Sequence, residues 1–110
     1  MAAESLGVVR VARQVLLTIV SNAALQVPGV VAVAESNERW ARRAGRPLPQ
    51  RGVALSVKES SVAADLYLVV AHDASVVEVG SAVQQEVAAA IEHMVGMRVR
   101  EVNVYIQDVA

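Results

Sequence analysis

The sequence of 110 residues contains no cysteine and no phenylalanine, and only one tryptophan and two tyrosines. The absence of cysteine excludes disulfides, thiol catalysis and thiolate metal sites, and it fits a reducing compartment. The scarcity of aromatic side chains leaves a core built from valine, alanine, leucine and isoleucine. Such small branched side chains suit a sheet packed beneath helices, and they do not line a roomy aromatic ligand pocket.

Long apolar runs and a dominant charge are also missing. No stretch approaches about 18 uninterrupted apolar residues, so no transmembrane helix is expected. The opening MAAESLGVVRVARQV lacks the basic and apolar regions of a signal peptide. The formal net charge of −1 is too balanced to imply a polyanionic partner by itself. We therefore predict a soluble cytoplasmic protein with one domain over residues 1–110, of which residues 1–7 are flexible.

One segment, ERWARRAGRPLPQR, departs from this balance of charge. It holds five arginines against one glutamate, a charge of +4, so the net charge of −1 leaves −5 for the rest of the chain. Prolines and glycines predict a long loop over residues 36–52. Arginines around a tryptophan are typical of surfaces that stack bases and contact phosphates, although Pro47 and Pro49 favour a stiff, solvated connector. The candidate contact residues are Arg39, Trp40, Arg42, Arg43 and Arg46.

Hydrophobic spacing predicts the elements of the first two thirds of the chain. A helix is expected over residues 13–27, because apolar residues recur at helical spacing until Pro28-Gly29 stops them. Leu25 projects opposite the apolar stripe of this helix, which makes it a candidate partner contact. Residues 8–12 form either a short strand or a lead-in to the helix. Strands are predicted over 30–35, 53–57 and 62–73, and the last two form a hairpin.

The final third of the chain reads as a helix followed by a strand. Ser75 and Glu78 have the spacing of a capping box, and Gly96 stands where a left-handed residue ends a helix. A strand follows over residues 97–109, and Val99 is out of step with its other apolar residues. A one-residue bulge near Arg100 would restore the register. The apolar stripe of the helix consists of Val76, Val79, Val83, Val87, Ile91 and Met94.

These elements predict an α+β fold, a two-layer sandwich. Both helices are amphipathic on one side only, so they should lie together on one face of a mixed sheet of about four strands. On the opposite face, strand alternation places Val69 among tyrosines and amides. Such a mixture is common where proteins meet, because tyrosine brings both contact area and a hydrogen-bonding group. The candidate contact residues on this face are Tyr67, Asn103, Tyr105 and Gln107.

The sequence has few residues that could catalyse a reaction or bind a metal ion. His72 and His93 have no partner at metal-binding spacing, and a helix C-terminus offers His93 a structural role. Asp65, inside an apolar strand, would suit a general acid if it were buried with a raised pKa, but solvent or a backbone donor explains it as well. No nucleophile elbow, phosphate-binding loop or dinucleotide motif occurs. No catalytic, cofactor-binding or metal-binding residue is predicted, and the protein is expected not to be an enzyme.

Several blocks together resemble a known family. VRVARQVLLTIVSNAALQVPGVVAV, RGVALSV, VAADLYLVVAHD and VQQEVAAAIEHMVGMRVREVNVYIQDV are similar, in order and spacing, to the alkaline shock protein family, also called the Gls general-stress family. The resemblance covers the chain from about Val8 to Val109. The middle loop departs from it, because many relatives have a Gly-rich segment where this chain is Arg-rich.

The resemblance implies a bacterial protein linked to cell-envelope stress, without catalytic residues. Relatives of this kind self-associate, and some are held at the membrane by a partner with transmembrane segments. The first hypothesis is therefore a scaffold or adaptor that forms homo-oligomers and contacts a membrane-anchoring protein. The alternative is a module that binds nucleic acid or an anionic surface through the Arg-rich loop.

Overall fold

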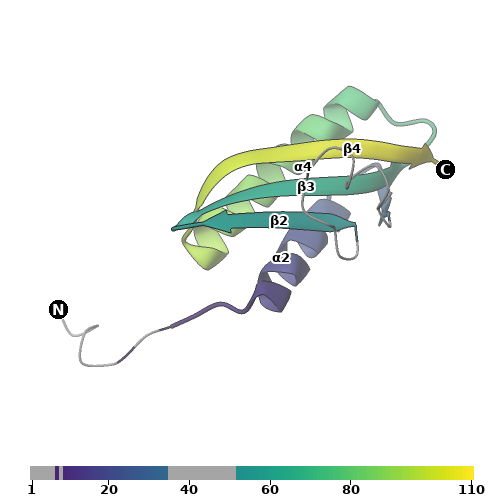
Figure 1. The fold of residues 1–110 in the computed structure, drawn as a ribbon. Coiled ribbons are helices and arrows are strands. Elements are labelled where there is room, and N and C mark those ends of the chain that lie inside the picture. Colours follow the sequence, from purple (N-terminus) through teal and green to yellow (C-terminus); the bar gives the residue numbers. More distant parts are fainter. Residues whose placement is uncertain (1–6, 8, 35–51) are drawn as a thin grey trace, which may run out of the picture.

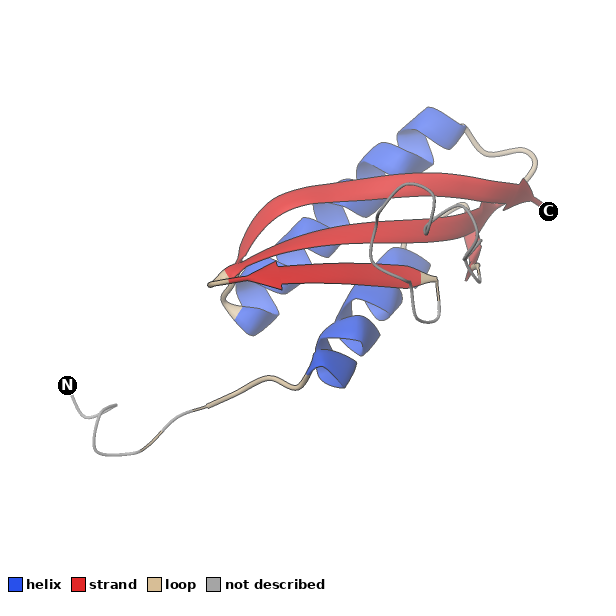
Figure 2. Cartoon of the chain, viewed as in Figure 1, coloured by secondary structure: helices blue, strands red, loops and turns tan. Residues whose placement is uncertain are grey.

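The computed structural model describes residues 7, 9–34 and 52–110. Two helices lie on one face of a four-stranded sheet in this part of the chain, which confirms the predicted α+β sandwich (Figures 1 and 2). The elements are α2 (Arg13–Leu25), β1 (Val30–Val33), β2 (Val53–Lys58), β3 (Ser61–Val70), α4 (Val76–Ala90), the π-helical turn η1 (Ile91–Val95) and β4 (Arg98–Val109).

Strand β3 is the centre of the sheet. It pairs with β4 in parallel on one side and with β1 and β2 antiparallel on the other. β2 lies beside the first part of β3, where Lys58 is opposite Ser61, and β1 lies beside its end, where Val33 is opposite Leu68. The sheet is therefore mixed, with the predicted β2–β3 hairpin and a parallel β3–α4–β4 connection.

The core lies between this sheet and the helices. Every second residue of β3 is fully buried in it, which is what alternation along a strand requires. These residues are Val62, Ala64, Leu66, Leu68 and Val70. Helix α2 contributes Leu16, Leu17, Val20, Ala23 and Ala24, and α4 contributes Val79, Val83 and Val87. Small branched side chains thus fill the interior, as the composition predicts.

Helix α2 follows an extended lead-in rather than a strand. Ala12, its N-cap residue, has φ −68° and ψ 146°, and residues 9–12 are assigned to no strand. The helix ends before Pro28, as predicted. Leu25 in its last turn is 44% exposed, in keeping with a position opposite the buried stripe.

Helix α4 begins as predicted but ends differently. The Ser75 hydroxyl accepts a hydrogen bond from the Glu78 main-chain nitrogen at 3.3 Å. At the other end the helix widens into η1, where the Gly96 nitrogen donates to the carbonyl of Ile91. The expectation that Met94 belongs to the buried stripe is wrong, because Met94 is 69% exposed and Val95 packs against the core instead. A π turn holds more residues than an α turn, so the inward position after Ile91 moves along by one.

Strand β4 contains the predicted bulge. Val99 pairs with Val62 and Glu101 pairs with Ala63, so Arg100 is the extra residue. A residue without a counterpart at this point returns the apolar positions of β4 to the core side. Val99, Val102, Val104 and Ile106 all contact the core as a result.

Candidate interaction surface on the sheet

The face of the sheet away from the helices contains buried side chains as well. Asp65 and Tyr67 alternate with the core residues of β3, and neither belongs to the hydrophobic cluster beneath the helices. Asp65 is 6% exposed and Tyr67 is 1% exposed. The centre of this second face is therefore buried, and it combines a carboxylate with an aromatic ring. A central strand whose two faces are both covered has buried side chains on each of them.

Asp65 is held by an amide of the neighbouring strand. The Asn103 amide nitrogen donates a hydrogen bond to the Asp65 carboxylate at 2.9 Å, and the two residues are register partners in the parallel β3–β4 pair. On the other side of β3, Asp65 is opposite the small, buried side chain of Ala54. The carboxylate is thus fixed by the sheet itself, because buried polar groups are stable only when they are hydrogen-bonded.

The two tyrosines stack one register position further along. Tyr67 and Tyr105 are partners in the parallel pair, and their ring centroids are 5.1 Å apart with planes 19° from parallel. Tyr105 is half-buried, so part of its ring reaches the surface. The expectation that Tyr67 is an accessible contact needs correction. Its side chain is covered, in part by the ring of Tyr105, so Tyr105 alone presents tyrosine chemistry to a partner.

Gln107 occupies an irregular position. Ile106 is opposite Leu68 while Asp108 is opposite Val69, so the register shifts at Gln107. Simple alternation from Tyr105 predicts that Gln107 shares the second face, but the shift makes Asp108 the residue opposite Val69. Gln107 is exposed, two residues beyond Tyr105 on β4.

The Arg-rich segment lies outside the described residues, and with it Arg39, Trp40, Arg42, Arg43 and Arg46. Its two ends are described. The Ala34 nitrogen donates to the Tyr67 carbonyl at 2.6 Å, and the Tyr67 nitrogen donates to the Gly52 carbonyl at 2.9 Å. β1 and β2 therefore lie one after the other on the same side of β3, and Ala34 and Gly52 both bond to Tyr67.

Arg100 was not among the predicted site residues, although the bulge at its position was predicted. Its guanidinium donates to the Ser61 hydroxyl at 2.8 Å and to the Ser56 carbonyl at 3.0 Å. The side chain thus reaches from β4 to the start of β3 and across to β2. This contact fastens the end of the hairpin and leaves Arg100 exposed beside the surface of Asn103 and Tyr105.

Side chains from the helix layer contact both edges of the sheet. Arg13 of α2 donates to the Leu55 carbonyl on β2 at 2.6 Å, and Gln84 of α4 donates to the Val102 carbonyl on β4 at 3.0 Å. Free main-chain groups at a sheet edge can pair with another chain, and covering them prevents unwanted pairing. These two contacts join residues 42 and 18 positions apart, so no local pattern reveals them.

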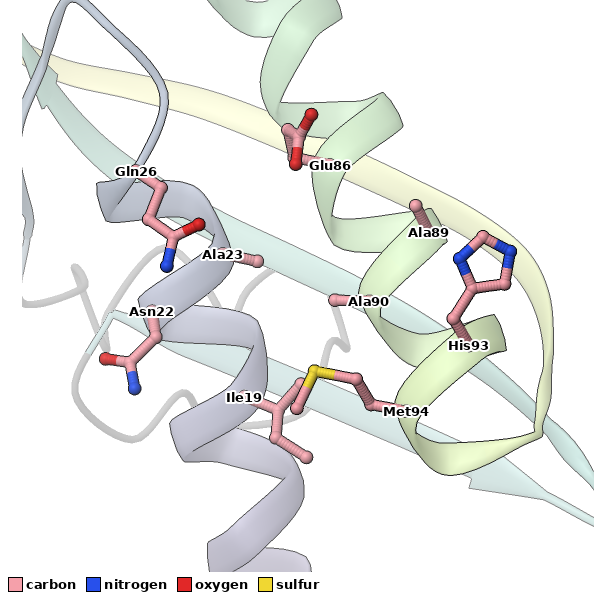
Figure 3. Close-up of a pocket in the computed structure, with 9 residues that line it drawn as sticks. All are labelled: Ile19, Asn22, Ala23, Gln26, Glu86, Ala89, Ala90, His93 and Met94. Carbon is pink, nitrogen blue, oxygen red and sulfur yellow. The ribbon is translucent and has the colours of Figure 1, made fainter.

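A groove of about 380 Å³ runs between α2 and the end of α4 (Figure 3). In the close-up, Ile19 and Met94 extend toward each other, and Ala23 and Ala90 face each other across the groove. Asn22, Gln26, Glu86, Ala89 and His93 complete the lining. The small alanines bring the helices together, and the π turn places Met94 at the surface of the groove. Leu25 is not part of it.

Neither a cluster of metal-binding side chains nor a membrane-spanning helix is found in the described ranges. No group of three or more histidine, aspartate or glutamate side chains there is arranged to hold a metal ion. His72 lies with its Nδ1 atom 3.0 Å from the Ala110 carbonyl oxygen, which is a structural contact. No helix in residues 9–34 or 52–110 has the length and hydropathy needed to cross a membrane.

A curated protein resembles this chain over most of its length. A curated relative, the uncharacterized protein Spy1614 of Streptococcus pyogenes, is 24% identical over 106 residues, which cover 94% of this chain and 88% of that protein.

The solved structure MamM-CTD 215-293 is 16% identical with a TM-score of 0.56, covering 88% of this chain and 99% of that one. The nickel form of a MamM CTD variant is 17% identical with a TM-score of 0.54, covering 86% and 96%. Both show a shared fold. The model of the alkaline shock protein family, described as having a cell envelope-related function, matches residues 1–110, and the chain therefore belongs to this family.

Proposed function

We propose that this protein is a non-catalytic scaffold or adaptor of the cell envelope, which acts by self-association and by contacts with other proteins. Membership of a family with a cell envelope-related function over residues 1–110 is the observation that carries this proposal. Two side-chain contacts support it, because Arg100 bonds to Ser61 and Asn103 bonds to Asp65, and both contacts join β4 to β3.

The contact surface that we propose for protein partners is the sheet face around Tyr105. Tyr105 is held in place by stacking on Tyr67, and Asn103 is held by Asp65. Side chains fixed in this way lose little conformational entropy when a partner binds. Gln107 and Arg100 stand beside them as exposed polar groups. A rigid aromatic anchor with a polar rim is the usual anatomy of a protein contact.

We further propose that the protein works in the cytoplasm and reaches the membrane through an anchoring partner. Affinity purification from the native host in mild detergent, followed by mass spectrometry, tests this directly. Wild type and Tyr105→Asp are compared, with Gln85→Asp as a matched control, because Gln85 is an exposed residue of α4 on the other layer. A membrane protein that co-purifies with wild type and the control, but less with Tyr105→Asp, supports the proposal.

Sedimentation of wild type over a wide range of concentration tests self-association. A monomer at every concentration, with no co-purifying protein, would contradict the scaffold proposal.

The second candidate function is binding to nucleic acid or an anionic surface through Arg39, Trp40, Arg42, Arg43 and Arg46. The charge of +4 on this segment favours it, against −5 on the rest of the chain. Binding through phosphate contacts releases counterions, so its affinity must fall steeply with salt. Titration of a labelled single strand at two salt concentrations, with wild type and an Arg42→Ser, Arg43→Ser, Arg46→Ser variant, separates this function from the first.

A further inference from the structure

Strand β4 forms an open edge of the sheet, and in Figure 1 it is the upper margin of the sheet. It is 12 residues long, and within the described ranges it pairs only with β3. Its middle part, residues 102–106, has no lysine, no proline and no charged side chain, which are the usual means of keeping a sheet edge from pairing. A long edge of this composition is a template for another strand.

The pairing with β3 identifies the main-chain groups of β4 that face outward. In a parallel pair, a residue that faces the neighbouring strand bonds to the two residues that flank its register partner. The Ala110 nitrogen accordingly donates to the carbonyl of Val70, whose register partner is Val109. Partners of the even-numbered residues of β3 therefore face the open edge, and the bond from Gln84 to the Val102 carbonyl agrees. These outward residues are Val99, Val102, Val104, Ile106 and Val109.

The spacing of the outward residues is symmetric about Val104. Val99 and Val102 are three positions apart, and so are Ile106 and Val109, because the register with β3 shifts once near each end of β4. When β4 is laid antiparallel on a copy of itself with Val104 opposite Val104, every outward residue meets an outward residue. A foreign strand of regular alternation would stay in step only between the two shifts. This symmetry favours a second copy of the chain as the occupant of the edge.

The side chains are complementary in the same register. Arg100 of each copy comes opposite Asp108 of the other, and both residues are exposed. Opposite charges on facing strand positions are stabilising, whereas like charges there are destabilising. Asn103 comes opposite Tyr105, so an amide lies beside a phenol on the second face of the sheet. The two charged ends of β4 therefore favour an antiparallel contact.

The helix beside this edge leaves room for a second copy. Gly80 and Ala88 stand one turn before and one turn after Gln84, on the stripe of α4 that borders β4. An added Cβ at Gly80 would meet no atom within 4 Å, so packing within the chain does not require a glycine there. Glycine weakens the interior of a helix. Its low bulk at this place allows the α4 helices of two copies to lie beside the paired strands.

We propose that two copies of this chain pair their β4 strands antiparallel about Val104, which joins their sheets into one continuous sheet with both helix layers on one side. The Val102 carbonyl has two lone pairs, so it can accept from the partner and keep its bond to Gln84. The Val109 nitrogen donates to the Asp108 carboxylate at 2.8 Å, so residues 102–106 carry the pairing. This proposal rests on the proposed self-association and names its partner and its surface.

Disulfide trapping tests the register, because the natural chain has no cysteine. Val104→Cys and Ile106→Cys are matched single-cysteine chains, since both positions are half-buried and contact the core. Facing Cα atoms at Val104 would be about 5.5 Å apart, which a disulfide can span. The two Ile106 positions would be offset by about 13 Å along the strand. We expect about fivefold more cross-linked dimer from Val104→Cys than from Ile106→Cys.

Mixing two single-cysteine chains adds a positive control for the register. Ile106 comes opposite Val102 of the second copy. An oxidised mixture of Val102→Cys and Ile106→Cys chains should therefore give the mixed dimer in excess over either symmetric dimer.

Charge reversal gives a reading by sedimentation that needs no cross-link. Asp108→Arg brings arginines opposite each other in both pairs, and Arg100→Asp brings aspartates opposite each other. Each variant alone should self-associate about tenfold more weakly than wild type. An equimolar mixture should recover, because the arginines of one chain then meet the aspartates of the other. Asp73→Arg, at an exposed position outside β4, makes the same change of charge and should leave self-association unchanged.

Recovery in the mixture also separates pairing from the bond that Arg100 makes to Ser61 within its own chain, since that bond stays lost.

Three outcomes would overturn the proposal. A wild type that is monomeric at every concentration removes both edge pairing and the proposed self-association. An assembling wild type with equal cross-linking of Val104→Cys and Ile106→Cys removes edge pairing alone. A mixture of Asp108→Arg and Arg100→Asp that associates no better than its components removes it as well.

Discussion

Replacing Gly52 by alanine should be one of the most damaging small changes in this chain. Gly52 has φ +75°, and an added Cβ would lie against the carbonyl oxygen of Ala34 and 2.5 Å from the Cγ1 atom of Val33. The Ala34 carbonyl belongs to main chain that is tied to β3. The hydrogen bonds from Ala34 to Tyr67 and from Tyr67 to Gly52 prevent either segment from moving alone.

The expected loss combines two effects. The left-handed backbone costs an alanine roughly 1–2 kcal/mol. Displacing the junction weakens two main-chain hydrogen bonds, each worth about 1 kcal/mol. We therefore expect Gly52→Ala to lower the free energy of unfolding by about 3–4 kcal/mol, and the melting temperature by at least about 10 °C.

Gly96→Ala is the matched control. Gly96 has φ +77°, but an added Cβ there meets no atom within 4 Å. Only the backbone strain remains, so its loss should be roughly 1–2 kcal/mol. Urea denaturation of wild type and both variants measures the difference, which should be about 2 kcal/mol. Equal losses in the two variants would refute the close junction of Ala34 and Gly52.

Three further predictions concern the surface. Tyr105→Asp should leave the melting temperature within a few degrees of wild type while reducing partner capture, and a loss of folding in circular dichroism would show that its ring is structural. Gln84→Ala should expose the Val102 carbonyl at the β4 edge and raise light scattering on storage, whereas unchanged scattering would show that this edge needs no cover. Replacing Arg42, Arg43 and Arg46 by Ser should abolish any salt-dependent anion binding without unfolding the domain, and a large fall in melting temperature would mean that these arginines are structural.

Local patterns in the sequence determined most of the elements. The hydroxyl of Ser75 caps α4, Gly96 ends the helical segment in a left-handed conformation, and Arg100 is the extra residue of a bulge. The first two features depend on neighbours within a few positions, and the bulge was visible because Val99 is out of step with the later apolar residues of β4. Caps, turns and alternation are set by local backbone geometry, which one chain segment fixes by itself.

The tertiary structure decided which surfaces are accessible. The alternation of side chains along β3 correctly predicted that Tyr67 lies outside the core beneath the helices. The burial of Tyr67 depends on the residues that cover the other face of the sheet, among them Tyr105. Val95, rather than Met94, faces the core because the helix ends in a π turn. Packing against α2 and the sheet selects this turn. Helical periodicity assumes 3.6 residues per turn throughout, so it could not reveal this exchange.

The contacts at the sheet edges and at the strand junction were also beyond the sequence. Arg13 meets Leu55, Gln84 meets Val102, and the chain returns at Gly52 beside the point where it departed. These pairs are brought together only when the sheet and the helix layer assemble. An arginine or glutamine on an exposed helix face has many possible partners, and the folded arrangement of distant segments selects one. The sequence therefore determined what each element is, and packing determined what each edge and face can contact.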